Sequence, residues 1–206
     1  MYDLPYYREH DEGVIMAFIE RHPFAFLTGC DSTSRPVATQ TPVFAEREGD
    51  RIVLSGHIMT GTDHHEAFSS NEQVLVVFNG PHTYVSATWY ANPRVASTWN
   101  YMSVHARGVI RFLNRDGLEG MLRKTSLHFE NNDEQSPTVF DNLPSTFTDK
   151  MMNMIVGFEI EVTEIKAAFK LSQERDAETH QSIVEELESG DDNARMIAAE
   201  MAKRSP

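Results

Sequence analysis

Short stretches rich in β-branched and aromatic residues recur along the chain, and turn-forming residues separate them. The apolar runs at 24–28 and 74–78 are typical of buried strands, and 158–165 alternates as a half-buried strand does. Further strands are expected at 35–45, 51–55, 84–87 and 103–110. Because the helices interrupt a series of strands, the pattern favours an antiparallel barrel that is mainly β with flanking helices, and not a doubly wound sheet.

Helical spacing and capping residues predict where these helices begin. Asp11 is expected to cap a helix that carries an apolar stripe and ends before Pro23. Asp63 and Asn114 are expected to cap two further helices, and the dipeptide Gly80-Pro81 should break the strand before it. Another helix is expected at 143–155, and acidic helices at about 174–206. No repeat or linker stands out, so residues 1–206 are expected to form a single domain.

Composition and charge exclude several classes of protein. The sequence has no apolar run long enough for a membrane helix and no basic leader, so the cytoplasm is the expected location. The one cysteine, Cys30, cannot form an intrachain disulfide and is expected to be a buried, inert thiol. A net charge of −13 argues against a large direct interface with DNA.

The sequence lacks the common motifs for nucleotide binding and for metal binding. The sequence contains neither a P-loop nor a dinucleotide fingerprint, and it lacks HExxH and CxxC. It has nine histidines, but the adjacent pair His64-His65 would point its rings about 100° apart on a helix. Neither histidine has a second histidine at i+4 on its helix face, and no thiolate accompanies them, so no metal site is expected.

The segment from Leu54 to His65 runs from a strand through a loop of small and hydroxyl residues into a helix start. Backbone N–H groups at such a helix terminus favour an anion such as phosphate, and Thr60 and Thr62 add hydroxyl donors. The same hydroxyls could instead simply cap the helix. The residues alone leave both interpretations open.

The segment from Gly80 to Gly108 is dense in aromatic residues and holds both tryptophans, Trp89 and Trp99. Aromatic side chains beside polar groups suit a ring-shaped ligand or a protein interface. A barrel core with a dimer interface would explain the same composition.

This aromatic segment, with Trp89-Tyr90, Thr98-Trp99-Asn100-Tyr101 and His105, resembles the PaiB family, whose members are described as negative transcriptional regulators. The resemblance extends over most of the chain, through residues 2–23, 56–57, 157–163 and 169–173. It implies a split β-barrel of the FMN-binding type, related in fold to the pyridoxamine phosphate oxidases. It also implies a homodimer with flavin in the cleft between two protomers.

The resemblance assigns candidate cofactor-binding residues by position. His57, Thr60, Thr62 and His64 would hold the FMN phosphate, and Trp99 and Asn100 would border the cleft. Lys170, Ser172 and Gln173 would contact the flavin.

Two positions depart from the family pattern. Thr60-Gly61 stand where relatives carry a basic residue, and Glu174 replaces asparagine in the motif that begins at Ser172. A missing cation weakens phosphate binding, since charge-assisted contacts are stronger than neutral ones.

The expected function is therefore that of an FMN-binding, PaiB-type regulator that acts on transcription indirectly, through its flavin. The alternative is an FMN-dependent oxidoreductase acting on a small substrate, and a third class is a flavin carrier without turnover. Whether the chain is an enzyme stays open at this point.

Overall fold

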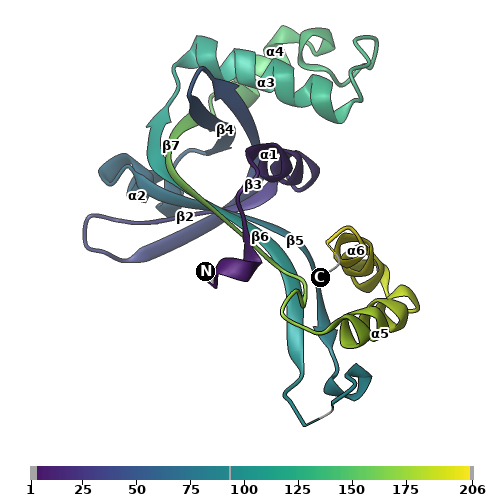
Figure 1. Ribbon diagram of the computed structural model, residues 1–206. Coiled ribbons are helices and arrows are strands. Elements are labelled where there is room, and N and C mark those ends of the chain that lie inside the picture. Colours follow the sequence, from purple (N-terminus) through teal and green to yellow (C-terminus); the bar gives the residue numbers. More distant parts are fainter. Residues whose placement is uncertain (1–3, 93, 205–206) are drawn as a thin grey trace. The chain divides into compact units, whose positions relative to one another are not determined.

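The computed structural model describes residues 4–92 and 94–204 (Figure 1). Met1 to Asp3, part of the segment expected to carry no leader, lie outside the described residues, as do Pro93, Ser205 and Pro206. The strands are β1 (Arg8–Glu9), β2 (Phe24–Cys30), β3 (Pro36–Glu48), β4 (Arg51–Met59), β5 (Gln73–Val85), β6 (Thr98–Phe112) and β7 (Ile155–Lys170). The α-helices are α1 (Glu12–Arg21), α2 (Asp63–Ser70), α3 (Arg115–Phe129), α4 (Ser145–Met152), α5 (Ala177–Glu188) and α6 (Asp192–Ala202). Short 3₁₀ turns are η1 (Pro5–Tyr7), η2 (Ala87–Trp89) and η3 (Phe140–Asn142).

The strands form an antiparallel sheet in the order β1-β7-β4-β3-β2-β5-β6. β6 also pairs with β7, so the strands from β2 to β7 close into a ring. This is the expected split β-barrel with flanking helices, and the prediction of the fold class is confirmed. Ring closure removes the unpaired sheet edges that an open sheet would expose.

The chain divides into two compact units, to both of which β5, β6 and β7 contribute. The barrel unit comprises residues 23–77 and 106–164, and the helical unit comprises residues 1–22, 78–105 and 165–206. The expectation of a single domain stays a prediction.

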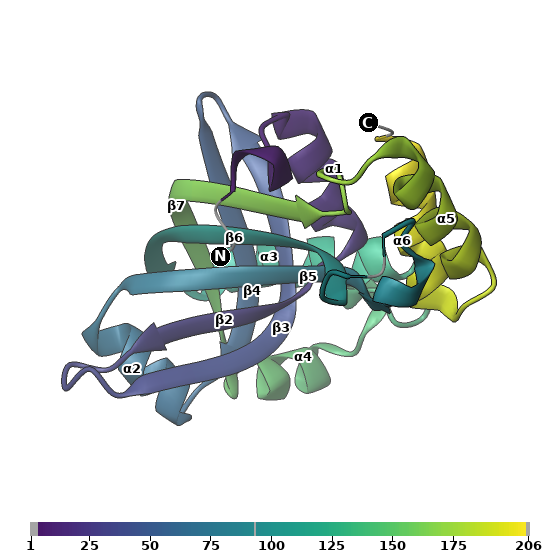
Figure 2. The same ribbon diagram turned by 60° about the horizontal axis from the view of Figure 1, so that its bottom comes forward.

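The barrel unit is built from hairpins with the alternating burial of half-buried strands. The hairpin between β3 and β4 turns at Gly49, whose φ of 62° suits glycine, as the Glu48-Gly49-Asp50 turn predicts. Along β4, Leu54, Gly56 and Ile58 are buried, whereas the residues between them face the other side. Figure 2 shows these strands crossing the barrel from a second angle.

The helical unit has its own core of fully buried side chains. Phe18 of α1 packs on Phe169, with ring centroids 5.2 Å apart. α5 and α6 lie side by side in Figures 1 and 2 and bury Ile183, Leu187 and Ile197. The helices expected at about 174–206 are α5 and α6, which Gly190 and the Asp191 cap separate.

Several predicted boundaries are confirmed and others are wrong. Asp11 and Asn114 cap α1 and α3 as expected, each accepting a backbone N–H of the first turn. Thr62, and not Asp63, caps α2, because its hydroxyl accepts the N–H of His65. The helix expected at 143–155 is shorter, since Ile155 already begins β7.

The prediction of a break at Gly80-Pro81 is also wrong, because β5 continues through both residues. A Cβ on Gly80 would lie 2.5 Å from the Phe18 ring, so glycine is needed there for close packing, not for a turn. Cys30 is half-buried at the end of β2, and the expectation of a fully buried thiol is therefore wrong.

Candidate functional site

The loop between β4 and α2 supplies the first group of candidate residues. The hydroxyl of Thr62 donates to the Met59 carbonyl at 3.0 Å, and its oxygen accepts the His65 N–H at 3.3 Å. Nε2 of His64 lies 2.9 Å from the same oxygen. Because the Thr62 proton goes to Met59, His64 must donate, so this nitrogen carries a proton.

The neighbouring residues complete a loop that is fixed by its own hydrogen bonds. The N–H and the hydroxyl of Thr60 both donate to the Met154 carbonyl, at 3.0 and 3.1 Å. Gly61 has a φ of 71° and donates its N–H to Nδ1 of His65. The capping interpretation is therefore confirmed for Thr62 and is wrong for Thr60, whose hydroxyl donates to Met154 and does not cap α2.

The groups at this loop are of chemical types that bind phosphate, but no lysine or arginine accompanies them. Helix N-termini, threonine hydroxyls and histidine N–H groups are all donors that phosphate oxygens accept. However, residues 52–72 contain no lysine or arginine, and Asp63 and Glu66 are acids in the first turn of α2. A phosphate at this loop would be held by neutral donors and histidine.

His57 lies apart from this loop group. Its side chain is half-buried on the face of β4 opposite Leu54 and Ile58, and it lines a cavity beneath α3 and α4. Burial lowers the pKa of His57, so its imidazole is neutral at pH 7. A neutral ring among apolar side chains would add no charge to phosphate binding.

The second group of candidates lies in the helical unit. Asn100 and Ser172 are both buried and form two hydrogen bonds with each other. The Asn100 amide donates to Oγ of Ser172 at 3.0 Å, and the Ser172 hydroxyl donates to Oδ1 of Asn100 at 3.1 Å. Ser172 has a φ of 61°, a left-handed conformation that costs free energy outside glycine. The mutual pair helps to hold this strained turn after β7.

Lys170 is buried in the same unit. Its ammonium donates to the Thr98 hydroxyl at 2.5 Å and to the Trp99 carbonyl at 2.8 Å, and lies 5.6 Å from the Tyr7 ring centre. Burial is the largest influence and lowers the pKa of Lys170, against the opposing field of Glu174. Lys170 thus fixes the backbone that carries Trp99.

The Gln173 side chain also forms hydrogen bonds within its own turn. Its amide donates to the Phe169 carbonyl at 2.5 Å and accepts the Leu171 N–H at 2.8 Å. The side chains of Lys170, Ser172 and Gln173 therefore shape the turn after β7. In this unit, Trp99 is the candidate whose side chain is exposed.

The ring of Trp99 belongs to an exposed aromatic cluster that we define as His82, Tyr84 and Trp99. Trp99 is 55% exposed, and its ring lies 6.1 Å from Tyr84 and 6.2 Å from His82, centroid to centroid. His82 and Tyr84 share one face of β5 because strand side chains alternate. That period-two spacing is the signal by which the sequence could have added them to the candidate site.

Two further findings concern the whole described chain. Among residues 4–92 and 94–204, no helix is both long and apolar enough to cross a membrane. Over the same residues, no group of three or more histidine, cysteine or acidic side chains is arranged to hold a metal ion.

Comparison with known proteins gives the family. Residues 1–164 match the family model described as "Putative FMN-binding domain". The chain is 32% identical over 203 residues to the protease synthase and sporulation protein PAI 2 of Bacillus subtilis (strain 168), covering 96% of this chain and 95% of that protein.

Solved structures share the fold at low sequence identity. The FAD and heme binding protein from Mycobacterium smegmatis matches with a TM-score of 0.62 at 16% identity, covering 85% of this chain and 79% of that one. The flavocytochrome Anf3 from Azotobacter vinelandii matches with a TM-score of 0.57 at 17% identity, covering 80% and 69%.

The ring of strands and the family match define the class: an FMN-binding protein with a split β-barrel. Its cofactor is FMN, which supplies redox chemistry when bound. Within this class, the chain belongs to the PaiB family of FMN-binding proteins.

Proposed function

We propose that this protein is a homodimeric PaiB-type regulator that acts on transcription indirectly, through bound FMN. The observation that carries the proposal is the helix N-terminus at α2, around which Thr60, Thr62 and His64 lie; their protons are donated within the protein, and a bound phosphate would replace these internal acceptors. His57, the fourth residue assigned to phosphate by position, faces the cavity beneath α3 and α4, so we give the phosphate to the other three.

For the flavin ring, the exposed aromatic cluster supports a role of Trp99 at the border of a cleft. Lys170 would hold Trp99 in place through its carbonyl, and the pair of Asn100 and Ser172 would hold the strand and the turn. Gln173 would stabilise the same turn. In this proposal these residues mostly position the flavin contact and do not react themselves.

The phosphate site predicts that FMN binds more tightly than riboflavin. It also predicts that Thr60→Arg tightens FMN binding about five- to tenfold, because a charge-assisted hydrogen bond replaces a neutral one. Riboflavin affinity should not change. The measurement is a titration of apo-protein with each flavin, followed by fluorescence quenching.

The matched control is Thr146→Arg, which adds the same charge at an exposed position of α4. It should leave the affinity for both flavins unchanged. Equal affinity of the wild type for FMN and riboflavin, or no gain in Thr60→Arg, would remove the phosphate site from the α2 terminus.

A dimer is expected because the exposed aromatic cluster is of the kind that interfaces bury. Light scattering at micromolar concentration should give twice the monomer mass of 23.4 kDa. Trp99→Asp should raise the dimer dissociation constant roughly thirtyfold, since central tryptophans are often worth 2 kcal/mol or more. Phe24→Asp changes an aromatic residue of similar exposure on β2 and serves as the comparison. A monomeric wild type would contradict the shared cleft.

Tight operator binding by this protein alone is not expected. The net charge is −13, and the lysine and arginine residues of α3 are paired with acids: Arg115 with Asp149, Arg123 with Glu119 and Asp141, and Lys124 with Glu46. Non-specific DNA affinity comes mainly from cations that replace counterions, and these cations are already neutralised.

The measurement is a gel-shift assay at roughly 0.15 M salt with and without FMN. Specific binding to one sequence tighter than about 10⁻⁸ M would support a direct repressor and overturn the indirect mode of action.

A further inference from the structure

A cavity of about 290 Å³ lies in the barrel unit beneath α3, η3 and α4. Its walls are mainly apolar, with Leu122 and Phe129 from α3, Phe140 from η3, and Phe147, Met151 and Met152 from α4. In Figure 1, α3 and α4 lie side by side, and α3 also contacts β4, which carries His57 into the cavity wall. The α2 loop assigned to the FMN phosphate does not line this cavity.

The polar wall residues other than His57 already have partners. The hydroxyl of Thr125 donates to the Met121 carbonyl at 2.9 Å, and that of Thr148 donates to the Ser145 carbonyl at 3.1 Å. Ser126 donates to the Arg123 carbonyl at 3.0 Å, and Glu130 accepts the Ser136 hydroxyl at 2.8 Å.

His57 differs from these residues. Within residues 4–92 and 94–204, the His57 ring makes no hydrogen bond to the protein, and its nitrogens are not sealed from solvent. A ligand with one polar atom would replace water at this ring with a direct hydrogen bond inside an apolar cavity. Because burial keeps the ring neutral, it offers one donor and one acceptor, and no charge.

We propose that this cavity binds a small, neutral aromatic molecule with one hydroxyl group, and that the hydroxyl pairs with His57. Three phenylalanine rings and two methionine thioethers make walls that favour an aromatic ligand. The volume is at the small end of ligand pockets and suits one or two fused rings. An anionic ligand would find the Glu130 carboxylate and no lysine or arginine in the wall.

The site is distinct from the proposed FMN site. FMN carries a phosphate dianion and a three-ring system, and neither suits a small apolar cavity with a neutral anchor. Binding of the aromatic alcohol should therefore be independent of FMN.

The test uses 2-naphthol and naphthalene as probes on the full-length protein, with and without FMN. Binding is followed by NMR of ¹³C-labelled methionine methyl groups, which report on Met151 and Met152 directly. The wild type should bind 2-naphthol about five- to tenfold more tightly than naphthalene, the effect of one hydrogen bond.

Two variants separate the roles of the wall and of His57. His57→Leu should bring the affinities for the two probes to within about twofold of each other, and if it fails to fold, Met151→Trp still tests the cavity. Met151→Trp should fill the cavity and weaken both probes at least roughly tenfold, since it removes apolar burial. Met196→Trp, on α6 and similarly exposed, is the matched control and should bind both probes as the wild type does.

Equal wild-type affinity for the two probes, or unchanged binding by Met151→Trp, would overturn the proposal. Displacement of 2-naphthol by FMN would overturn it as well, because the cavity would then be part of the flavin site. Loss of 2-naphthol binding on dimerisation would assign the cavity to an interface with a second copy. A failure of FMN to bind, by contrast, would leave the 2-naphthol result intact and count only against the proposed function.

Discussion

The Gly108→Ala substitution is expected to lower the free energy of unfolding by about 3 kcal/mol, or to prevent folding. Gly108 lies in β6, where a Cβ would come within 2.4 Å of the Glu161 carbonyl oxygen and 2.6 Å of Cγ2 of Ile160. Both atoms belong to β7. Because the closest obstacle is backbone, no change of side-chain rotamer can relieve the overlap, and the pairing of β6 with β7 must distort.

Gly120→Ala is the matched control, because it makes the same chemical change with no steric obstacle. Gly120 lies within α3, and nothing lies within 4 Å of the Cβ that alanine would add. The control should stabilise the protein by about 0.5–1 kcal/mol, because alanine favours helix over glycine. Urea unfolding measures both variants. A loss below about 1 kcal/mol for Gly108→Ala would show that the strands can separate at little cost.

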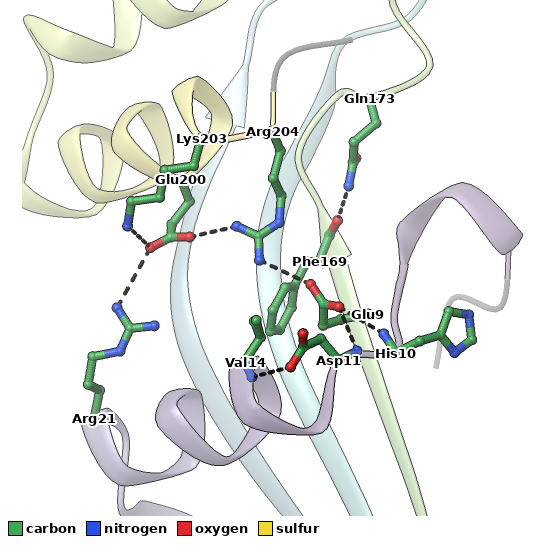
Figure 3. Close-up of polar contacts among 10 residues, drawn as sticks. All are labelled: Glu9, His10, Asp11, Val14, Arg21, Phe169, Gln173, Glu200, Lys203 and Arg204. Carbon is green, nitrogen blue, oxygen red and sulfur yellow. Dashed lines mark hydrogen bonds and ion pairs between the residues drawn. The ribbon is translucent and has the colours of Figure 1, made fainter.

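The second large effect is expected at Glu200, the nearly buried carboxylate of α6, whose side chain is only 11% exposed. Figure 3 shows it among cations: Oε1 accepts the Lys203 ammonium at 2.8 Å and pairs with Arg21 at 3.6 Å. Oε2 accepts Nη1 of Arg204 at 2.8 Å, and Nη2 of the same arginine reaches Glu9 at 3.1 Å. The carboxylate thus ties α1, β1 and the end of α6 together within the helical unit.

Glu200→Gln should lower the free energy of unfolding by about 2 kcal/mol at pH 7. Breaking a buried ion pair costs about 3–5 kcal/mol, and the partly exposed partners Arg21 and Lys203 reduce this figure. Glu188→Gln, at an exposed position of α5, should change stability by less than about 0.5 kcal/mol. Chemical unfolding at pH 7 measures both variants, and equal losses would contradict a special role of Glu200.

The same carboxylate predicts a pH dependence. Burial raises the pKa of Glu200, but the hydrogen bonds from Lys203 and Arg204 outweigh this effect, so the folded-state pKa lies below its ordinary value of 4.5. Its contribution to stability is therefore complete above pH 4.5 and is lost as the pH falls through the folded-state pKa. The difference between wild type and Glu200→Gln should shrink over that acid range. A difference that stays constant would exclude this linkage.

Local features of the sequence were enough to predict much of the secondary structure. The caps at Asp11 and Asn114 and the turn at Gly49 depend on residues a few positions apart, so their physics is contained in short segments. The same holds for the strand expected at 158–165, which lies within β7, although its burial alternates only at 158–160. The prediction failed at Gly80, because the constraint there is the ring of Phe18, far away in the sequence.

The candidate site likewise contains a part that a local pattern predicted and a part that depends on tertiary packing. The sequence identified the α2 loop, since a strand followed by hydroxyl residues and a helix start is a local pattern. It did not foresee that His57 would lie beneath α3 and α4 with unpaired ring nitrogens, or that Lys170 would hold the Trp99 backbone. His57 lines one cavity with Leu122, and Lys170 donates to the Trp99 carbonyl, so each arrangement depends on residues far apart in the sequence.

By itself, the sequence determined most of the strands, the caps at Asp11 and Asn114 and the acidic charge, because these follow from composition or from neighbouring residues. Its resemblance to a known family over most of the chain indicated FMN binding. Only the tertiary structure decided that β6 meets β7 to close the ring, that Glu200 is neutralised by Arg204, and that a cavity forms at His57. The physical reason is that long-range packing selects among many pairings that local propensity leaves equal in free energy.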